Sequence, residues 1–409
     1  MKSKQLSRRE FVLAGSAAAL ALDGKPSLAQ EQTVRIGFPF ELSGKFVSYG
    51  TSGKRGAEMA LEAFKYKAGN IKIEPLFRDV QSDTQVTVSA FTELVISSDV
   101  QFIVGPIASP VVAAAIPVVK QKRPLWVVPG SSSTSLEQEL GEEDFFFHTW
   151  SYAYHFHNSE AQALKQALGG KGRIAIIYSD DNYGRTHLPY VEKFYPELGF
   201  EIVASELVRA NSTDLNPILT KISRTNANIL IGLVQTNDAV TLAKQIHTRR
   251  LNIPYLVGTS YTQLREWQAA VGEAQEGWVG VTTYIPGMER PASKDYPQIF
   301  PRLSEWAARF RARFNNLEPD FLDVLNYAST AILLIAIERA GSGDKNKVAD
   351  ELRKLDIETV SGRAKFVPSG GGTKQQTFTD MVVFQRQKDA NVLIYPLDVA
   401  TGKLVPLKS

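Results

Sequence analysis

Residues 102–110, FIVGPIASP, predict a short buried strand, a loop and the start of a helix. The apolar run Phe102–Val104 is typical of a strand that is covered on both faces of a parallel sheet. Ser109 is a good N-cap residue, and Pro110 suits the first helical position. A strand that leads directly into a helix is the unit from which α/β folds are built.

A second loop of the same design follows one strand later. The apolar run Leu125–Val128 leads into PGSSST, residues 129–134. Thr134 and Glu137 match the T-x-x-E capping box, which predicts another helix start. In an open parallel sheet both helix N-termini lie at the carboxyl edge of the strands, where ligands bind at a switch in strand order. The two loops therefore predict a site at this edge.

The same alternation of strand and helix patterns extends through residues 34–283, which is typical of α/β folds with parallel sheets. The expected strands are Val34–Phe38, Ile71–Phe77, Phe102–Val104, Leu125–Val128, Ile174–Tyr178, Phe200–Ala204, Ile229–Val234, Tyr255–Gly258 and Trp278–Thr283. The expected helices are Gly53–Lys67, Asp83–Ser97, Asn182–Leu198, Asp214–Arg224 and Asp238–Arg249. The first four units and the next five predict two doubly wound lobes with a joint near 150–154. Helical stretches at 298–314 and 321–340 follow both, so we expect the chain to cross between the lobes more than once.

The N-terminus carries an export pattern. SRREFVL, residues 7–13, places two arginines before the uncharged apolar stretch Val12–Leu22, and Ser27-Leu28-Ala29 suits a signal peptidase. This pattern predicts a twin-arginine export signal over residues 1–29 and a mature chain that acts in the periplasm. The apolar stretch is too short to span a bilayer.

Charge and cysteine content limit the functions that the chain can have. The chain has 46 Lys and Arg against 43 Asp and Glu; residues 1–29 hold five of the former and two of the latter, so residues 30–409 carry no formal net charge. The excess of basic residues in the full chain comes from residues 1–29, so it does not indicate binding to nucleic acid or to anionic lipid. There are no cysteines, which excludes disulfides, a thiol nucleophile and a Cys-ligated metal.

Hydroxyls and unpaired backbone N–H groups in the two loops predict an anion site. A carboxylate is the natural guest, because neutral donors at helix N-termini hold it without a buried Lys or Arg. The plainer alternative is that these serines only cap helices. Two such loops in successive units favour a binding site.

Catalytic motifs are weak. Only His155-x-His157 has a hint of metal spacing, and we expect neither metal nor cofactor. The string GTSYT, residues 258–262, lacks the second glycine of the Gly-x-Ser-x-Gly nucleophile elbow. No phosphate-binding glycine motif follows an expected strand. We expect no enzyme, and a serine hydrolase or amidase remains the weaker alternative.

Several short motifs follow one another along nearly the whole mature chain. They are VRIG (34–37), LSG (42–44) with Tyr49-Gly50, VGP (104–106) through Ser109, PGSS (129–132), RIAIIY (173–178), DNYG (181–184), TVSG (359–362) and FQ (384–385). In this order and spacing they resemble the type I periplasmic solute-binding proteins, in the leucine/isoleucine/valine-binding branch that serves ABC importers. The resemblance implies two doubly wound parallel-sheet lobes joined by three crossover strands. We expect residues 30–152 plus about 285–358 in the first lobe, and 153–284 plus about 359–409 in the second.

The resemblance also implies the ligand contacts. Ser109, Gly130, Ser131 and Ser132 would hold a carboxylate, with Tyr49 and Tyr183 against the rest of the ligand. We expect closure of the lobes to bring Tyr183, Gln235 and Ser260 over it, although the family often has an aromatic residue where this chain has Gln235-Thr236.

The sequence differs from the family at the position of the acidic residue that binds the ammonium group of an amino-acid ligand. The family's acidic position falls in GTSY, residues 258–261, at or near Ser260, and no carboxylate lies there. An ammonium buried without a charged partner costs several kcal/mol. Glu41 is the foremost substitute, followed by Asp181 and Asp238. The alternative is a ligand without an ammonium: an aromatic or aliphatic carboxylate, an amide or urea. The aromatic residues that could form an apolar wall are Phe40, Phe46, Tyr152, Tyr154, Tyr261 and Tyr284.

We therefore expect a monomeric solute-binding component of an ABC importer. Its partners would be a small carboxylate or amino-acid-like ligand, of the branched-chain amino acid type, and a membrane permease, with no nucleic acid. A ligand sensor of the same fold, which releases a signalling partner, is the alternative.

Overall fold

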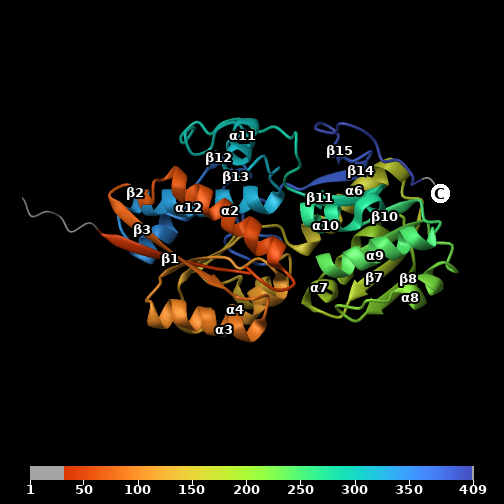
Figure 1. The fold of residues 1–409 in the computed structure, drawn as a ribbon, viewed down its shortest axis with the longest axis horizontal. Helices are drawn as coiled ribbons and strands as arrows, with labels where there is room; N and C mark the ends of the chain where they lie inside the picture. The colour runs from red at the N-terminus through yellow and green to blue at the C-terminus, as the bar shows by residue number, and fades with distance from the viewer. Residues whose placement is uncertain (1–31, 408–409) are drawn as a thin grey trace, which may run out of the picture. The chain divides into compact units, whose positions relative to one another are not determined.

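The computed structural model describes residues 32–407, of which those from Thr33 onward form one compact unit. The expected export signal over residues 1–29 lies outside the described residues. Two main sheets organise the unit (Figure 1). One has six strands in the order β2-β3-β1-β4-β5-β6, and the other has seven in the order β15-β14-β11-β10-β9-β7-β8. We call each sheet with its helices the first and the second lobe.

The first sheet is parallel apart from its short β2 edge. Its strands are β1 (Thr33–Phe40), β2 (Lys67–Ala68), β3 (Ile71–Asp79), β4 (Phe102–Val104), β5 (Leu125–Val128) and β6 (Phe146–His148). The helical segments between them are α2 (Val47–Ala63), α3 (Thr84–Thr92), the π turn η1 (Glu93–Ser97), α4 (Ser109–Lys122) and α5 (Ser135–Leu140). Every residue of β4, β5 and β6 is buried, because helices cover both faces of the sheet.

The second sheet combines a parallel core with an antiparallel edge. Its strands are β7 (Arg173–Ser179), β8 (Glu201–Val208), β9 (Ile229–Leu233), β10 (Tyr255–Val257), β11 (Trp278–Thr282), β14 (Val382–Gln387) and β15 (Ala390–Tyr395). β14 pairs antiparallel with β11, and β15 with β14. The helical segments of this lobe are α6 (Ala153–Leu168), α7 (Asn182–Glu197), α8 (Asn216–Ile222), α9 (Thr236–Arg249), η2 (Ser260–Gln263), α10 (Arg265–Val271) and η3 (Gly272–Gln275).

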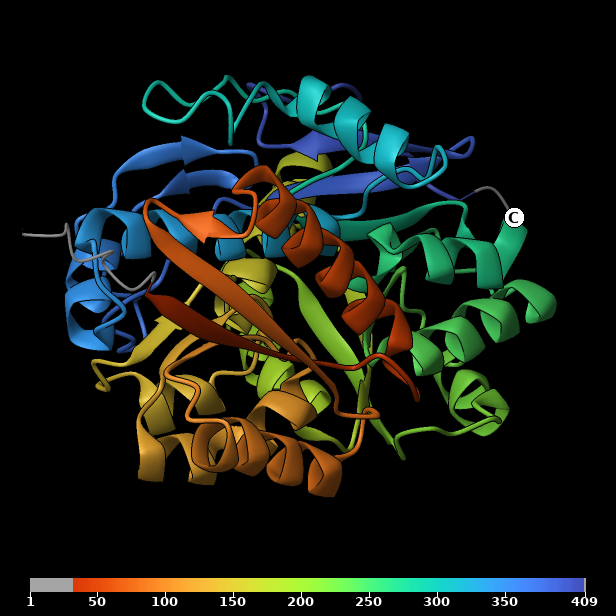
Figure 2. The ribbon, with the colours of Figure 1, turned by 60° about the vertical axis from the view of Figure 1, so that its left-hand side comes forward.

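The chain crosses between the lobes three times: after β6, after β11 and before β14. After β11 it adds α11 (Leu303–Arg313), α12 (Phe321–Ala340), α13 (Lys345–Arg353) and the small β12–β13 pair (Ile357–Thr359, Gly362–Ala364). Helices α12 and α13 return to the first lobe, where α12 lies beside α2 (Figures 1 and 2). The two-lobe α/β fold with three crossings is therefore confirmed.

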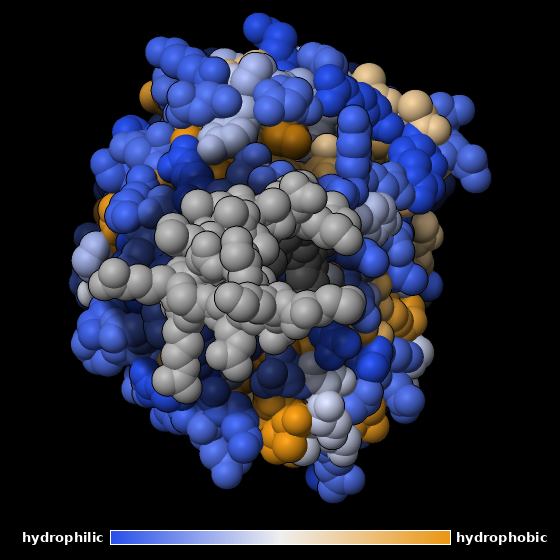
Figure 3. Space-filling model, turned by 90° about the vertical axis from the view of Figure 1, so that its left-hand side faces the viewer, coloured by the Kyte–Doolittle hydropathy of each residue, from blue (hydrophilic) through white to orange (hydrophobic). Residues whose placement is uncertain are grey.

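Helix α12 is the core helix of the first lobe. Among the described residues it is the one helix that is long and apolar enough to cross a membrane, yet 94% of its most apolar window is buried inside the protein. On the face drawn in Figure 3, the visible described residues are mostly hydrophilic, and the hydrophobic ones are scattered. The apolar surface of α12 is thus used for internal packing.

Local details differ from the sequence expectations. Helix α2 starts at Val47, six residues before the expected start at Gly53, and α6 was not expected. Ala108 is the N-cap of α4, so Ser109 is its first residue. The capping box at Thr134 is wrong, because the Thr134 side chain makes no cap bond, and Glu137 instead accepts from Tyr154 Oη at 2.8 Å.

One part of the C-terminal region lies where the sequence did not place it. His148 of β6 donates its N–H to Gln375 O at 3.0 Å, and Thr377 N–H donates to His148 O at 3.0 Å. Residues 375–377 therefore contact the first sheet, although everything after about 359 was expected in the second lobe. Hydrogen bonding to the free edge of β6 accounts for this placement.

The contact between α2 and α12 requires a glycine. A Cβ atom at Gly56 would lie 2.7 Å from the backbone N of Tyr327, and closer still to Asp323 O. Gly56→Val should therefore lower the free energy of unfolding by about 1–3 kcal/mol or more, because two backbones must move apart. Urea denaturation measures this loss. Gly370→Ala, where no atom lies within 4 Å of the added Cβ, is the control, and equal stability of both variants would contradict this packing.

Candidate ligand-binding site

One cavity at the carboxyl ends of β4 and β5 brings together eight of the nine residues predicted for the site. Its lining is Tyr49, Ile107, Ala108, Ser109, Gly130, Ser131, Ser132, Trp150, Tyr183, Gln235, Ser260, Phe321 and Leu322, around a cavity volume of ≈ 30 Å³ in this arrangement of the lobes. The residues come from both lobes and from the first crossing. The cavity therefore lies where the two lobes meet, at the sheet edge that the loops predict.

Glu41 is the predicted residue that does not line this cavity. It is fully buried behind the loop that follows β4, where its Oε1 accepts from Ile107 N–H at 3.1 Å and from Ala108 N–H at 2.8 Å. Burial raises the pKa of Glu41 to about 7, although these backbone bonds act in the opposite direction. The expectation that Glu41 faces the ligand is therefore corrected: its carboxylate positions the loop.

The loops that follow β4 and β5 in the first lobe are hydrogen-bonded to each other. Ser131 N–H donates to Ile107 O at 2.8 Å, and Ser131 Oγ donates to Ser109 Oγ at 3.2 Å. A Cβ at Gly130 would lie 2.6 Å from Ile107 O, so only glycine fits there. Ser131 itself has a φ of 58°, a conformation that non-glycine residues adopt rarely. Ser109 is the first residue of α4, so its N–H is among those that a helix leaves unpaired.

The second lobe supplies polar groups to the opposite wall. Gln235 precedes α9 and is 6% exposed, and its Nε2 makes no hydrogen bond within the described residues. Tyr49 bridges the lobes, since its hydroxyl lies 2.7 Å from Thr236 Oγ1. Tyr183 Oη lies 2.5 Å from Thr259 Oγ1. Gln235 Nε2 is thus a buried donor that a ligand acceptor would satisfy.

An apolar wall completes the lining, and sequence reasoning missed it. Trp150, Phe321 and Leu322 come from the first crossing and from the start of α12. The Trp150 and Phe321 rings stack with centroids 5.0 Å apart. The aromatic residues proposed for this wall do not line the cavity. Phe40, Tyr152, Tyr261 and Tyr284 are at most 2% exposed and belong to the core, as is usual for aromatics.

No lining residue carries a formal charge. Asp181 instead caps α7, accepting from Gly184 N–H at 3.0 Å and from Ser179 Oγ at 2.7 Å. Asp238 lies in the first turn of α9, where burial raises its pKa. Asp181 and Asp238 were proposed as replacements for the missing acid, and neither of them lines the cavity. The described lining therefore offers hydroxyls, amides and aromatic rings, and no carboxylate for an ammonium.

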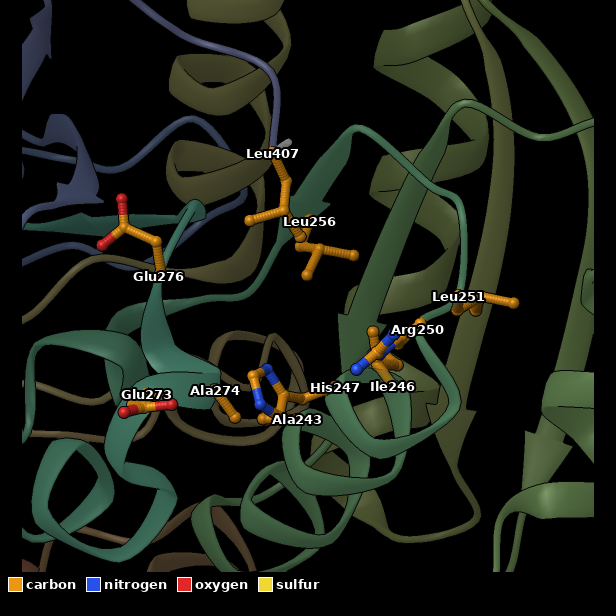
Figure 4. A pocket seen from close by; sticks show the side chains of 10 residues that line it. All are labelled: Ala243, Ile246, His247, Arg250, Leu251, Leu256, Glu273, Ala274, Glu276 and Leu407. Carbon is orange, nitrogen blue, oxygen red and sulfur yellow. The ribbon is translucent and has the colours of Figure 1, made fainter. Parts of the chain in front are cut away.

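A larger cavity lies elsewhere in the second lobe, between α9, η3 and the C-terminal segment (Figure 4). Its cavity volume is ≈ 550 Å³, and none of the residues predicted for the site lines it. Leu407 forms one wall above Leu256, while His247 and Glu273 lie on the helical side (Figure 4). Size alone does not make it the ligand site, because polar groups do not converge on it from both lobes.

The buried Glu41 carboxyl makes stability depend on pH. Its pKa is raised from 4.5 to about 7 in the folded protein. Between pH 4.5 and 7, Glu41 is therefore protonated in the folded state and ionised in the unfolded state. Stability is therefore lost as pH rises through this window, by up to about 3 kcal/mol. Glu41→Gln keeps the Oε1 acceptor and should show a smaller loss between pH 4.5 and 7 in urea denaturation. Parallel pH profiles for the two proteins would contradict this assignment.

Comparisons with known proteins identify the family of the chain. The periplasmic binding protein family model matches residues 33–391. The leucine-, isoleucine-, valine-, threonine- and alanine-binding protein of Pseudomonas aeruginosa is 23% identical, over 91% of this chain and 95% of that protein. Leu/Ile/Val-binding protein homolog 7 of Brucella abortus is 22% identical, over 97% of this chain and 98% of its own.

Solved structures share the fold. The leucine-binding protein LivK of Thermotoga maritima has a TM-score of 0.77 at 19% identity, covering 88% of this chain and 97% of its own. A solute-binding protein of an R. palustris ABC transporter, in complex with benzoate, has a TM-score of 0.76 at 16% identity, covering 92% and 98%. The family of these proteins implies an extracytoplasmic location. The chain belongs to the periplasmic binding protein family, in the branch of the leucine/isoleucine/valine-binding proteins.

Proposed function

We propose that this protein is the solute-binding component of an ABC importer and that it captures a small carboxylate without an ammonium group. The observation that carries the proposal is a cavity lined from both lobes by neutral donors and aromatic rings, with no charged residue. Neutral N–H and O–H groups suffice for a carboxylate at helix N-termini. An α-amino acid would leave its ammonium without a charged partner in this lining, at a cost of several kcal/mol.

Relatives and neighbours support the class of protein, and a group of solved neighbours supports the choice of ligand. Relatives carry branched-chain amino acid names, and one solved neighbour is a complex with isoleucine. Three other solved neighbours are complexes with benzoate, 3,4-dihydroxybenzoic acid and 4-hydroxybenzoate. The stacked Trp150 and Phe321 rings suit an aromatic acid. The uncharged lining favours these acids over leucine, isoleucine and valine.

Binding would proceed from one lobe to the other. The ligand carboxylate would first meet Ser109 and the loop 130–132, and closure would then bring Tyr183, Gln235 and Ser260 over it. Contacts between the lobes suit the closed state: Arg265 of α10 lies 3.2 Å from Asp320 and 3.0 Å from Asp323 at the start of α12. A ligand shifts the equilibrium toward closure only as far as it prefers that state.

The cellular context belongs to the same proposal. A twin-arginine signal over residues 1–29 would export the folded protein to the periplasm, where it acts as a monomer. The permease would recognise faces that closure brings into register. The lobes would comprise 30–152 plus about 285–358 and 153–284 plus about 359–409, with residues 375–377 returning to the first. No cofactor or metal takes part, and no chemical step is required.

A thermal-shift screen of residues 30–409 tests the ligand class. The panel is benzoate, 4-hydroxybenzoate, short aliphatic carboxylates, leucine, isoleucine, valine, benzamide and urea. A ligand at about 100 times its dissociation constant adds about 2.7 kcal/mol of stability. We expect stabilisation by carboxylates that lack an ammonium. Stabilisation by the amino acids alone would contradict the proposed ligand class, and stabilisation by none of the panel would contradict the carboxylate proposal.

The anion contacts are tested by removing two hydroxyls from the cavity. Ser109→Ala combined with Ser131→Ala should weaken benzoate binding at least tenfold, because a hydrogen bond to a charged group contributes about 1.5–3 kcal/mol. Isothermal titration calorimetry measures the affinity. Ser133→Ala is the matched control, since Ser133 is buried in the same loop but does not line the cavity. Equal affinities for the double variant and the control would reject the anion site.

A further inference from the structure

A buried series of hydrogen bonds leads from the cavity into the second lobe. Ser132 Oγ lies 2.7 Å from His187 Nε2, and His187 Nδ1 lies 2.8 Å from His157 Nε2. His157 Nδ1 lies 2.8 Å from Glu160 Oε2. Ser132 is 3% exposed and the other three side chains are fully buried. These four residues form what we call the relay, and Ser132 alone of them lines the cavity.

The relay joins the two lobes. Ser132 follows β5 in the first lobe, whereas His187 lies on α7, and His157 and Glu160 lie on α6 of the second lobe. Tyr183, which also lines the cavity, packs its ring 4.1 Å from that of His187. The relay is therefore complete only when the loop after β5 meets α7, which is the arrangement that also encloses the cavity.

Each neutral histidine in the relay has one N–H donor and one acceptor nitrogen, so the hydrogen bonds must all run in one direction. With a proton at the Glu160–His157 end, His157 donates to His187 and His187 donates to Ser132. The Ser132 O–H is then free to donate into the cavity. When that proton is lost, His157 donates to Glu160, His187 donates to His157, and Ser132 donates to His187. Ser132 then presents only lone pairs to the cavity.

We propose that this relay is a proton-controlled specificity element: its bound proton makes Ser132 a donor that holds a ligand anion, and loss of the proton makes Ser132 an acceptor. The consequence for a ligand rests on the proposed function. A carboxylate would bind together with the relay proton. A ligand with N–H donors, such as an amide or urea, would instead favour the relay that lacks the proton.

The surroundings of Glu160 favour the protonated relay. Its Oε1 is buried and has no partner within the described residues, which is costly for an ionised carboxylate. Burial raises the pKa of Glu160, with His157 acting in the opposite direction. The other titratable groups that act with it are Tyr183 and Tyr195 of α7 and Tyr261 of η2, and none of these is a cation. Burial also lowers the pKa of His187, which keeps this histidine neutral and the relay directional.

The same groups also suggest a serine nucleophile, because a Ser–His–carboxylate series serves hydrolases. Here the histidine beside Ser132 contacts a second histidine instead of the carboxylate, and serine and histidine come from different lobes. We therefore favour a binding role. Release of p-nitrophenol from p-nitrophenyl acetate that is lost in Ser132→Ala would overturn it.

The first experiment needs no ligand. Histidine imidazole NMR of ¹⁵N-labelled residues 30–409 between pH 5 and 9 reports which ring nitrogen of His187 carries the proton. We expect the Nε2–H form at low pH and the Nδ1–H form at high pH. Glu160→Gln should hold one form at all pH values. The control Glu192→Gln, an exposed position on α7, the helix of His187, should behave as the wild type. A single His187 form over the whole range in the wild type would overturn the relay.

The second experiment measures benzoate affinity by calorimetry from pH 5.5 to 8.5 in buffers of different ionisation enthalpy. We expect the dissociation constant to rise by up to tenfold per pH unit above the titration of the relay, with uptake of one proton. Ser132→Ala should lose this dependence but keep the change of the His187 ring. A pH-independent affinity in the wild type would overturn the coupling to the ligand. If His187 changes form but no carboxylate binds, the relay stands and the proposed function fails.

Discussion

The carboxylate of Glu41, which accepts the backbone N–H groups of Ile107 and Ala108, fixes the loop on which the whole site depends. Ile107 in turn accepts from Ser131 N–H, so one buried acid sets the positions of both loops of the first lobe. A buried acceptor that pairs two backbone donors removes the cost of leaving them unpaired. It also leaves the cavity surface itself uncharged.

An uncharged cavity has consequences for recognition. Hydrogen bonds from serine hydroxyls, from a helix N-terminus and from the unpartnered Gln235 Nε2 can hold an anion, but they do not compensate a cation. Two buried carboxyl groups lie one layer away from the cavity: Glu41 behind the loop that follows β4, and Glu160 at the far end of the relay in the second lobe. Each is buried, and each has a raised pKa. Protonation in this outer layer can therefore change the hydrogen bonds that the lining offers without placing a charge in the cavity.

Most of the architecture could be predicted, because strands that are covered on both faces require continuous apolar runs. β4, β5 and β9 begin where those runs begin. Helix α6 escaped prediction because its sequence, AYHFHNSEAQALKQAL, has polar residues on buried positions: His157 and Glu160 are fully buried there. Their side chains form a hydrogen bond with each other across one turn of the helix. A prediction from hydrophobic periodicity assigns such polar side chains to the exposed face. The antiparallel β14–β15 edge was likewise not expected, and neither was the return of residues 375–377 to β6.

The sequence by itself determined the family, the two-lobe fold and the loops that end on the cavity, since apolar runs, glycines and helix-start residues act locally. It placed Ser109, Gly130, Ser131 and Ser132 near one another because parallel strands end at one edge. Only the tertiary structure decided that Glu41 lies behind the loop, that Trp150 and Phe321 form the apolar wall, and that Ser132 meets His187. Those contacts join residues from 55 to 171 positions apart in the chain. The side of a loop on which a side chain is buried depends on the packing of distant segments, which local patterns do not encode.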